Sequence, residues 1–581
     1  MSKILIMDEG LANKIAAGEV VERIVNVVKE LVENSIDAEA SEIKIELVDS
    51  GIKKIIVNDN GIGMDKEDAV LCFSRHATSK LKNEKDLFRI SSLGFRGEAM
   101  PSIASVSKLN LKTSTGKSGT EVEIHGGEII DVKAITHSKG TTIEVSDLFY
   151  NTPVRLKYIK NLYTELSHII DYVNKMALSY PSIRFKLVNN DKVLLNTDGS
   201  GNILKVISKI YGIDVAKKMI YVEEENEDYK IYGYISMPEV AKSKKSVITT
   251  FVNNRLVKNN EINKVIIDAY HNYIHATRTP IVVLNIEVDN SLVDVNIHPT
   301  KMDIKFSKID SLKSLLSNII KEQLENRNLS KTTIPKTVNT LNVIEKYIEK
   351  EEEPVPKKVE EVQFDFYVED EESKYKTENE IKEIDSRIKP MRVLGNAHST
   401  YILCENEDGF YLVDQHAAAE RINFERILDE FDNLKDDKID LLIPLKIELS
   451  NSDYVVFKEK INHLEELGFS TEEFGDNTII IRTIPYWLDE NRLDESVRSI
   501  IDLIIEEKEF KSSKFNEKVA AMAACKSSIR ANEHLSIEGM QNIVDLLIKC
   551  RNPFNCAHGR PTIISLSNYK LERLFLRNID C

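Results

Sequence analysis

Several features that would place the chain in a particular class of protein are scarce or absent. Cysteine contributes only six of 581 residues, too few for a disulfide framework, so the special role expected of these residues is metal ligation. No apolar run approaches the ~20 residues of a membrane span, and the first residues lack the charged and apolar regions of a signal peptide. We therefore expect a cytoplasmic protein with no membrane partner.

Basic residues are outnumbered by acidic ones. The chain has 78 lysines and arginines against 94 aspartates and glutamates, a formal net charge of −16, which argues against a generally basic coat for nucleic acid. Any binding of double-stranded DNA must come from a local patch and must weaken as salt is raised. The P-loop pattern G-x-x-x-x-G-K-[ST] is also absent.

What is present is an ordinary globular composition with one interruption. The 581 residues, 42% hydrophobic and 30% charged, suffice for three or four domains of ~150 residues each. From about 330 to 386 the sequence changes to lysine and glutamate runs with few apolar residues, as in EKEEEPVPKKVEE. Such a segment cannot bury a core, so we predict a flexible linker between two folded halves.

The segment from Ala16 to Ala38 organises the first half. It predicts a helix packed on a sheet, because apolar residues recur at helical spacing. These residues are Ile24, Val27, Val28 and Leu31. Glu30 and Asn34 lie one turn apart at the edge of this stripe. A carboxylate there can polarise a water and an amide oxygen can bind Mg²⁺, although such a pair taken alone is usually solvated surface.

A predicted hairpin follows the helix. The runs EIKIELV and KKIIVNDN alternate in hydrophobicity around a turn at Asp49-Ser50-Gly51. The second run ends at Asp59, which could accept a hydrogen bond from an exocyclic amine. Gly61 and Gly63 come next and allow the backbone to approach a ligand closely. An ordinary hairpin end has the same residues.

Three further segments complete the pattern of the first half. Arg75–Lys80 is polar, Gly94–Ala99 is a glycine-bracketed loop that enters a helix, and Gly140–Val145 starts a strand. A loop that enters a helix offers free backbone N–H groups and a positive dipole end, which suit phosphates.

Together these segments resemble the Bergerat-fold ATPases. IAAGEVVER, FSRHATSK, LGFRGEA and DLFYNTP resemble the MutL family of mismatch-repair proteins in particular. The resemblance implies that Glu30 is the general base, that Asn34 binds Mg²⁺, that Asp59 holds the adenine amino group and that Thr141 holds the water beside it. It also implies a phosphate lid and its neighbours, formed by Gly94, Arg96, Gly97, Thr78 and Ser79.

The next segment, 203–330, is strand-rich with two long helical runs, and we predict an α+β subdomain. It contains FVNNR at 251–255 and VNIHPTK at 295–301. In the family that these motifs resemble, an HPxK loop reaches back to the γ-phosphate. The resemblance places Lys301 at that position, and a solvated loop lysine is the alternative.

After the linker, a hairpin around Asp408-Gly409 runs into the segment DQHAAAERINFE. His416 and Glu420 are four residues apart on one predicted helix face, which is a spacing that zinc sites use. Asp414 lies at the strand-to-helix junction. Glu425 lies about 180° round the helix from His416, so we expect an indirect or surface role for it.

Two distant segments add further candidate metal ligands. ACKSSIR contains Cys525, and CAHGRP contains Cys556 and His558. With His416 and Glu420 they form a nitrogen, oxygen and sulfur set that suits zinc or manganese. The pieces resemble the endonuclease domain of MutL proteins. The alternative is a set of buried structural cysteine and histidine residues.

Residues 440–515 predict a smaller inserted subdomain. The entry to it, Ile439–Pro444, is similar to the family's sliding-clamp docking segment except that isoleucine replaces the usual glutamine. A core strand is an equal interpretation of this segment. A helix and a strand follow, in SVRSIIDLIIEEKEF and TIIIRTIPYW.

The fold class expected from the whole chain is α+β multidomain. We expect a Bergerat-type ATPase sandwich over 1–202, a ribosomal-protein-like α+β subdomain over 203–330, a linker over 331–389 and an α/β dimerisation and endonuclease domain over 390–581. The resemblance implies a homodimer that uses ATP and Mg²⁺, with Zn²⁺ or Mn²⁺ at the C-terminal site. It also implies mismatch repair by nicking of double-stranded DNA with little sequence preference, in partnership with the mismatch-recognition protein MutS.

Two other functions are compatible with an ATPase of this kind. A type II topoisomerase would need a catalytic tyrosine domain and a DxD metal cluster, and neither is visible in the sequence. An ATP-gated scaffold with a purely structural metal remains as the alternative, but it gives Asp414 no task.

Overall fold

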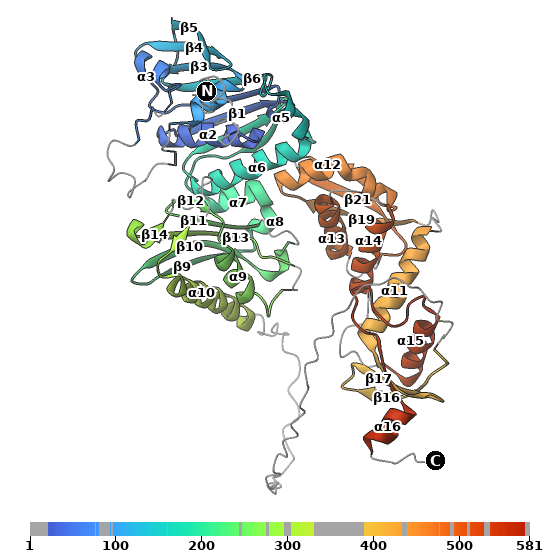
Figure 1. The fold of residues 1–581 in the computed structure, drawn as a ribbon. Helices are drawn as coiled ribbons and strands as arrows, with labels where there is room; N and C mark the ends of the chain where they lie inside the picture. Colours follow the sequence, from blue (N-terminus) through green and yellow to red (C-terminus); the bar gives the residue numbers. More distant parts are fainter. Residues whose placement is uncertain are drawn as a thin grey trace, which may run out of the picture.

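The computed structural model describes two folded halves of mixed α and β structure (Figure 1). The described residues are 21–75, 77–80, 93–94, 97–159, 161–242, 247–274, 278–294, 304–330, 388–432, 438–475, 477–488, 493–507, 510, 512–527 and 535–575. The predicted linker lies outside them except for its last two residues. Within the described residues, no helix is long and apolar enough to cross a membrane.

An eight-stranded sheet forms the first part, in the order β5-β4-β3-β6-β2-β1-β7-β8. Its strands are β1 (Glu42–Val48), β2 (Lys54–Asp59), β3 (Lys108–Ser114), β4 (Gly119–His125), β5 (Glu128–Ile135), β6 (Gly140–Ser146), β7 (Arg184–Asn189) and β8 (Lys192–Asn196). Buried residues alternate along β1, β2 and β6, so one face of the sheet is apolar. The helices α2 (Ile24–Asp37) and α6 (Leu162–Ser179) share one core with that face (Figure 1).

Three short helices connect these strands: α3 (Lys66–Leu71), α4 (Ala99–Ser105) and α5 (Pro153–Tyr158). The predicted hairpin is confirmed, because β1 and β2 pair antiparallel with Ile43 opposite Asp59. The predicted helix from Ala16 to Ala38 is wrong for residues 21–23, which are not helical, while residues 16–20 lie outside the described part of the chain. Helix α2 begins at Ile24, because Arg23 is extended and its guanidinium pairs with Glu165 of α6.

The second part is a five-stranded sheet in the order β12-β11-β13-β10-β9. Its strands are β9 (Met219–Glu225), β10 (Tyr229–Ser236), β11 (Ile248–Val252), β12 (Arg255–Val257) and β13 (Val282–Val288), with a small pair β14 (Val293–Asp294) and β15 (Lys305–Phe306) beside it. Its helices are α9 (Asn260–Ala269) and α10 (Ile309–Ser330), whereas α7 (Ile203–Tyr211) and α8 (Ile213–Ala216) contribute their buried residues to the core of the first sheet. Helices α9 and α10 pack together and share a second core with this sheet, as an α+β subdomain requires.

The C-terminal half begins with a four-stranded sheet in the order β16-β17-β18-β22. The strands are β16 (Arg392–Ala397), β17 (Tyr401–Asn406), β18 (Gly409–Asp414) and β22 (Ile563–Ser567), and the helices are α11 (Gln415–Asp432), α15 (Ile537–Lys549) and α16 (Asn568–Leu574). The predicted hairpin is confirmed, because β17 and β18 pair antiparallel. Helix α11 follows β18 directly in the chain. It packs against α15 and is partly buried by that contact.

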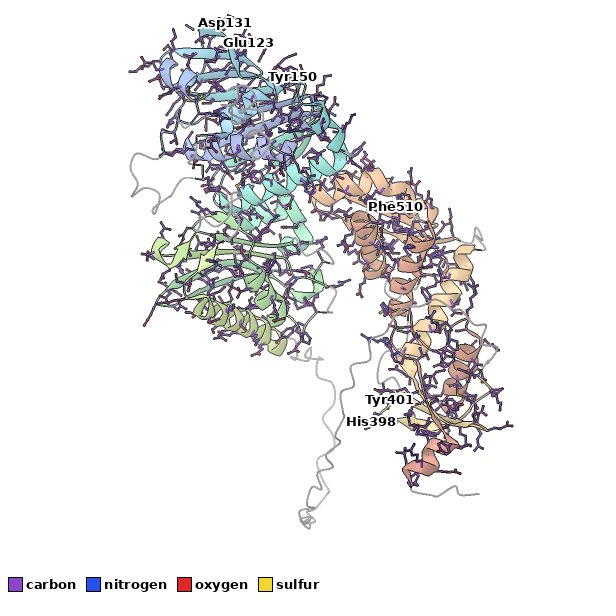
Figure 2. All side chains as sticks on the ribbon, in the orientation of Figure 1. Glu123, Asp131, Tyr150, His398, Tyr401 and Phe510 are labelled. Atoms are coloured by element: carbon purple, nitrogen blue, oxygen red, sulfur yellow. The ribbon has the colours of Figure 1, made fainter. Side chains whose placement is uncertain are left out.

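A three-stranded sheet in the order β19-β21-β20 lies within the C-terminal half. Its elements are β19 (Lys438–Glu448), α12 (Asn451–Glu466), β20 (Ser470–Glu473), β21 (Thr478–Pro485) and α13 (Leu493–Glu506), followed by α14 (Ser512–Ser527). Phe510, which is labelled in Figure 2, marks this part of the chain. Its ring stacks on that of His463 with the ring centres 3.7 Å apart. We refer to residues 438–510 as the inserted subdomain.

Candidate functional site

Helix α2 places the first pair of predicted residues. The four residues of its apolar stripe are buried, with 0 or 1% of their surface exposed, while Glu30 and Asn34 are half-buried one turn apart. The helix is anchored to α6 through Glu33, which accepts a hydrogen bond from the Tyr172 hydroxyl at 3.3 Å. Burial and the nearby carboxylates of Glu33 and Glu30 raise the pKa of Tyr172 well above its ordinary value.

Asp59 and Thr141 face each other across two strands. They are register partners in the antiparallel pair β2 and β6, and each has 7% of its surface exposed. The Asp59 carboxylate accepts hydrogen bonds from the Gly61 amide at 2.9 Å and from the Ser35 hydroxyl at 3.0 Å. Burial raises the pKa of this carboxyl, and the hydrogen bonds partly oppose the rise. One such bond to each oxygen leaves acceptor capacity for an amine.

Lys80 and Asp37 also belong to this region, although neither was predicted as a site residue from the sequence. The Lys80 ammonium lies 3.1 Å from the Asn34 amide oxygen and 2.5 Å from the Asp37 carboxylate. The same carboxylate accepts hydrogen bonds from the backbone amides of Leu93 at 2.9 Å and Gly94 at 3.1 Å. Asp37 thus gathers three donors of the kind that bind phosphate.

Two predicted glycines are required by close approaches of the backbone. Gly63 has φ +69°, and a Cβ there would lie 2.0 Å from the Ser114 carbonyl oxygen. Gly97 has φ +64°, and a Cβ there would lie 2.4 Å from the Ala77 carbonyl oxygen. Only glycine meets both demands at these positions.

The remaining residues predicted to bind the nucleotide lie near Lys80 and Asn34 or outside the described part of the chain. Thr78 and Ser79 are exposed beside Lys80, and the Thr78 hydroxyl accepts a hydrogen bond from the Lys80 amide at 3.2 Å. Gly94 lies close to Asn34, since a Cβ on it would be 3.8 Å from the amide oxygen. Arg96 and Lys301 lie outside the described residues.

In the C-terminal half, Asp414 ends strand β18 and directly precedes helix α11. Its carboxylate accepts a hydrogen bond from the Ala417 amide at 2.9 Å, which is the contact of a helix N-cap. Asp414 therefore has a structural task that the sequence analysis had not assigned. It does not join the group of possible metal ligands found among the described residues.

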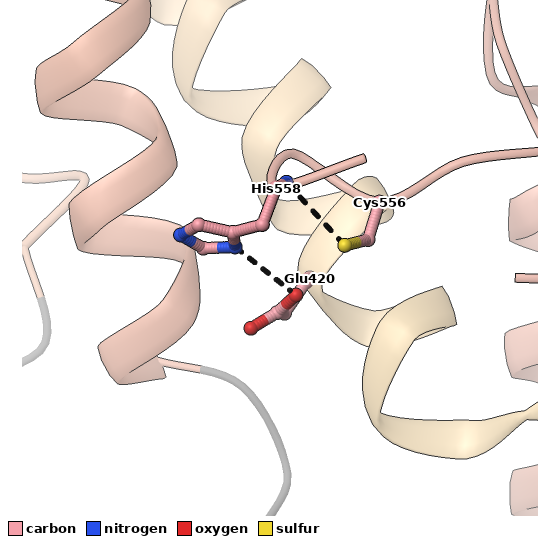
Figure 3. Close-up of side chains that lie close together, drawn as sticks. All are labelled: Glu420, Cys556 and His558. Carbon is pink, nitrogen blue, oxygen red and sulfur yellow. Dashed lines mark hydrogen bonds and ion pairs between the residues drawn. The ribbon is translucent and has the colours of Figure 1, made fainter. Parts of the chain in front are cut away.

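Glu420 gathers the C-terminal candidates. One ligand atom each of Glu420, Cys556 and His558 lies within 4.8 Å of the others, and Figure 3 shows the carboxylate on α11 facing the loop that carries the other two. His558 Nδ1 is 3.4 Å from one carboxylate oxygen, although the two residues are 138 apart in sequence. On the same helix, His416 Nε2 is 3.3 Å from the other oxygen.

Glu420 is buried among the side chains of the other predicted ligands. Its side chain is only 4% exposed, and burial acts to raise the pKa of the carboxyl, yet the pKa lies below its ordinary value. The groups that lower it are the thiols of Cys556 and Cys525 and the rings of His558 and His416. The other four predicted ligands thus lie around the buried carboxylate of Glu420. Imidazole, thiol and carboxylate donors at one point are the set that zinc sites use, so the residues fit such an ion.

Two residues of α11 hold the loop that carries Cys556. Glu425 accepts hydrogen bonds from the backbone amides of Arg551 at 2.6 Å and Asn552 at 3.1 Å. The Arg421 guanidinium donates to the carbonyl oxygens of Asn555 at 2.5 Å and Cys556 at 3.2 Å. The expectation of an indirect role for Glu425 agrees with these contacts, but their target, the backbone of a distant loop, could not be read from helical spacing.

Glu425→Ala is expected to weaken metal binding although Glu425 is no ligand. Its loss leaves two backbone donors without their partner and loosens the loop, and partners of this kind commonly change metal affinity about 10- to 100-fold. Competition with a chelator of known affinity measures this change. The matched control is Glu430→Ala, the half-buried ion-pair partner of Arg426 on the same helix, which should bind metal as the parent chain does. Unchanged affinity in Glu425→Ala would show that the loop holds its shape without this carboxylate.

Known proteins and family models match both halves of the chain. Family models match residues 22–148 (histidine kinase-, DNA gyrase B-, and HSP90-like ATPase), 207–325 (DNA mismatch repair protein, C-terminal domain) and 394–535 (MutL C terminal dimerisation domain). The DNA mismatch repair protein MutL of Anoxybacillus flavithermus is 42% identical over 606 residues, 99% of this chain and 100% of that protein. The protein of the same description from Listeria monocytogenes serotype 4a is 42% identical over 99% of both chains.

A solved structure of the N-terminal domain of a DNA repair protein is 27% identical. It covers 55% of this chain and 99% of its own, with a TM-score of 0.49.

Proposed function

The chain belongs to the MutL family of DNA mismatch repair proteins, and we propose that it is an ATP-driven repair protein whose C-terminal half nicks DNA. It carries an ATPase domain and a C-terminal dimerisation domain. We retain 1–202, 203–330 and 390–581 as the proposed domain boundaries, with the linker between the last two.

In the N-terminal half we propose that ATP binds beside α2. Glu30 acts as general base, Asn34 supplies its amide oxygen to Mg²⁺, and Asp59 accepts a hydrogen bond from the adenine amine with Thr141 beside it. The backbone amides of the lid and the Lys80 ammonium are suited to the phosphates, since Asp37 already attracts the same donors. Arg96, Gly97 and Lys301 keep the phosphate roles that the family resemblance implies.

In the C-terminal half we propose a metal-dependent endonuclease site. The observation that carries this proposal is the convergence of Glu420, Cys556 and His558 from two distant segments. A zinc or manganese ion, when bound, supplies an activated water and neutralises charge on the phosphate. Glu420, with Cys525 and His416 beside it, binds and orients that ion. Asp414 positions the water or a second, weaker ion.

The test is nicking of supercoiled plasmid by the full chain in Mn²⁺. The proposal predicts conversion to open circles that a chelator abolishes and added Mn²⁺ restores. A scaffold with a structural metal would hold its ion and leave the plasmid supercoiled. The N-cap contact of Asp414 suits that alternative, because it gives the aspartate a task without catalysis.

The segment 439–444 supports a proposed contact with the replication sliding clamp. Strand β19 and its neighbour β21 lose register between Asp440 and Leu445, so the residues between them bulge from the sheet. Leu442 and Ile443 are 102% and 85% exposed. The whole segment lies within β19, but Leu442 and Ile443 point away from the core, and exposed apolar side chains of this kind suit a partner protein.

Leu442→Ala with Ile443→Ala is expected to abolish binding to the sliding clamp while leaving ATP hydrolysis unchanged. These side chains contribute almost nothing to the core because they are exposed, whereas apolar anchors commonly dominate binding. Surface plasmon resonance with immobilised clamp measures the change. Tyr486→Ala, an exposed aromatic residue of the same subdomain, serves as control. Equal binding by both variants would contradict the assignment.

We propose a homodimer formed through the C-terminal half. Large apolar side chains remain exposed on β16, β17, β22 and α16 and directly after α16, in the part of the C-terminal half where Figure 2 labels Tyr401. They are Leu394, Tyr401, Ile564, Tyr569, Leu574 and Phe575. Exposed groups of this kind mark protein interfaces. MutS and double-stranded DNA are the other proposed partners, and the net charge of −16 makes weak, salt-sensitive DNA binding the expectation.

A further inference from the structure

The inserted subdomain lies against the N-terminal half of the same chain, residues 21–330, which we call the ATPase half (Figure 1). Helix α12 packs on α6, although their residues are nearly 300 positions apart in sequence. The Asn161 amide donates to the Glu459 carboxylate at 2.7 Å, and the Ser167 hydroxyl donates to the Ser452 carbonyl oxygen at 3.4 Å. Both contacts join side chains of α6 or its N-cap to α12.

The first turn of α12 is buried by this contact. Asn451 is 4% exposed and donates its amide to the Leu194 carbonyl oxygen of β8 at 2.6 Å. Val455, one turn further along, packs against the core of the ATPase half. A buried amide that bonds a backbone carbonyl of the other half, with an apolar neighbour in that half's core, indicates a fitted surface rather than a chance approach.

The edges of the contact carry opposite charges. The Lys192 ammonium lies 5.2 Å from the centre of the Tyr454 ring, and its charge also acts on Glu473. The Arg278 guanidinium is 3.4 Å from the Glu495 carboxylate and 3.5 Å from the Ser499 hydroxyl, both on α13. Basic residues of the ATPase half thus face acidic residues of the inserted subdomain.

The supporting helix on the ATPase side is also the one that holds α2. In helix α6, Tyr172 bonds to Glu33 of α2, and Glu165 pairs with Arg23, the residue directly before α2. The inserted subdomain therefore rests on the helix that supports Glu30 and Asn34.

We propose that α6, β8 and Arg278 form a docking surface for the inserted subdomain of the same chain. The docked state holds the C-terminal half against the ATPase half. Because the contact is rich in polar groups, as reversible interfaces between domains are, the two halves can also separate. The attraction between the charged edges makes docking weaker at high salt.

Cross-linking of the full chain tests the proposal. The variant Arg278→Cys with Glu495→Cys is treated with a short thiol cross-linker, and the linked peptides are identified by mass spectrometry. The control pair is Lys230→Cys with Glu495→Cys, because Lys230 lies in the same half but pairs with Glu223. Docking predicts a cross-link within one chain in severalfold higher yield than in the control. Equal yields, or a product that joins two chains, would overturn it.

Charge reversal gives a second readout that needs no cysteine. Lys192→Glu with Arg278→Glu should increase the radius of gyration in small-angle scattering, and adding Glu473→Lys and Glu495→Arg should reverse the increase. Lys186→Glu with Lys230→Glu changes the net charge equally and should leave the radius as it is. Circular dichroism establishes that each variant is folded. A radius that the first pair does not change more than the control pair does would refute the docking surface.

Discussion

Glu30→Ala is expected to slow ATP hydrolysis about a hundredfold or more, because a positioned general base contributes roughly 10²- to 10⁴-fold. ATP binding should persist, since Asp59, Thr141 and the lid amides do not depend on this carboxylate. Steady-state hydrolysis and equilibrium binding of ATP measure the two effects separately. Helix α2 should keep its place, because its buried apolar stripe and the contact of Glu33 with Tyr172 remain.

Two comparisons sharpen this result. Asn34→Ala should lose nucleotide binding itself, because the amide oxygen is the proposed Mg²⁺ ligand. Glu67→Ala, at an exposed position of α3, should hydrolyse ATP as the parent chain does. If Glu30→Ala turns over ATP at the parent rate, the base is another group.

The second large effect is expected at the C-terminal site, where Asp414 and Cys556 should behave differently. Cys556→Ser should lose both the bound metal and nicking, because the thiolate is a proposed ligand. Asp414→Asn should abolish nicking in Mn²⁺ while the metal, the fold and the dimer remain. Metal content by mass spectrometry, plasmid nicking and size-exclusion chromatography measure the three properties.

The N-cap contact makes Asp414→Asn a clean variant. Asparagine caps a helix about as well as aspartate does, so the start of α11 is preserved while the charge is removed. Asp414→Ala serves as comparison, because loss of the cap alone typically costs about 1 kcal/mol. If Asp414→Asn nicks normally, the aspartate is only a cap. If it loses metal and unfolds, its role is structural, and the scaffold alternative gains support.

Local pattern predicted much of the N-terminal half. The spacing of Val27, Val28 and Leu31 predicts the buried face of α2, and the alternation of two short runs predicts the hairpin that ends at Asp59. These features depend on neighbours in sequence, whose geometry is fixed by helix and strand periods. The start of α2 was missed because the extended conformation of Arg23 accompanies its pairing with Glu165, a residue far along the chain.

Residues joined over long distances were harder to find. Cys556 and His558 were associated with Glu420 through their ligand chemistry and through family resemblance, because no periodicity links positions as far apart as Glu420 and His558, which are separated by 138 residues. Asp37 and Lys80 could have been predicted from their neighbours in sequence. Asp37 lies three residues after Asn34 on the same helix, and Lys80 directly follows Ser79. The contact of Glu425 with two backbone amides leaves no mark on the sequence of the loop it holds. Neither does the packing of α12 on α6.

The most direct test of the proposed function compares Glu420→Gln with Glu430→Gln in the full chain, by measuring metal content and plasmid nicking on the same preparations. Glu420 is the buried carboxylate around which the other four candidates lie, whereas Glu430 pairs with Arg426 on the same helix. Glu420→Gln is expected to lose metal and Mn²⁺-dependent nicking together, with ATP hydrolysis and the folded state retained, whereas Glu430→Gln is expected to lose neither. Full nicking by Glu420→Gln would contradict this expectation.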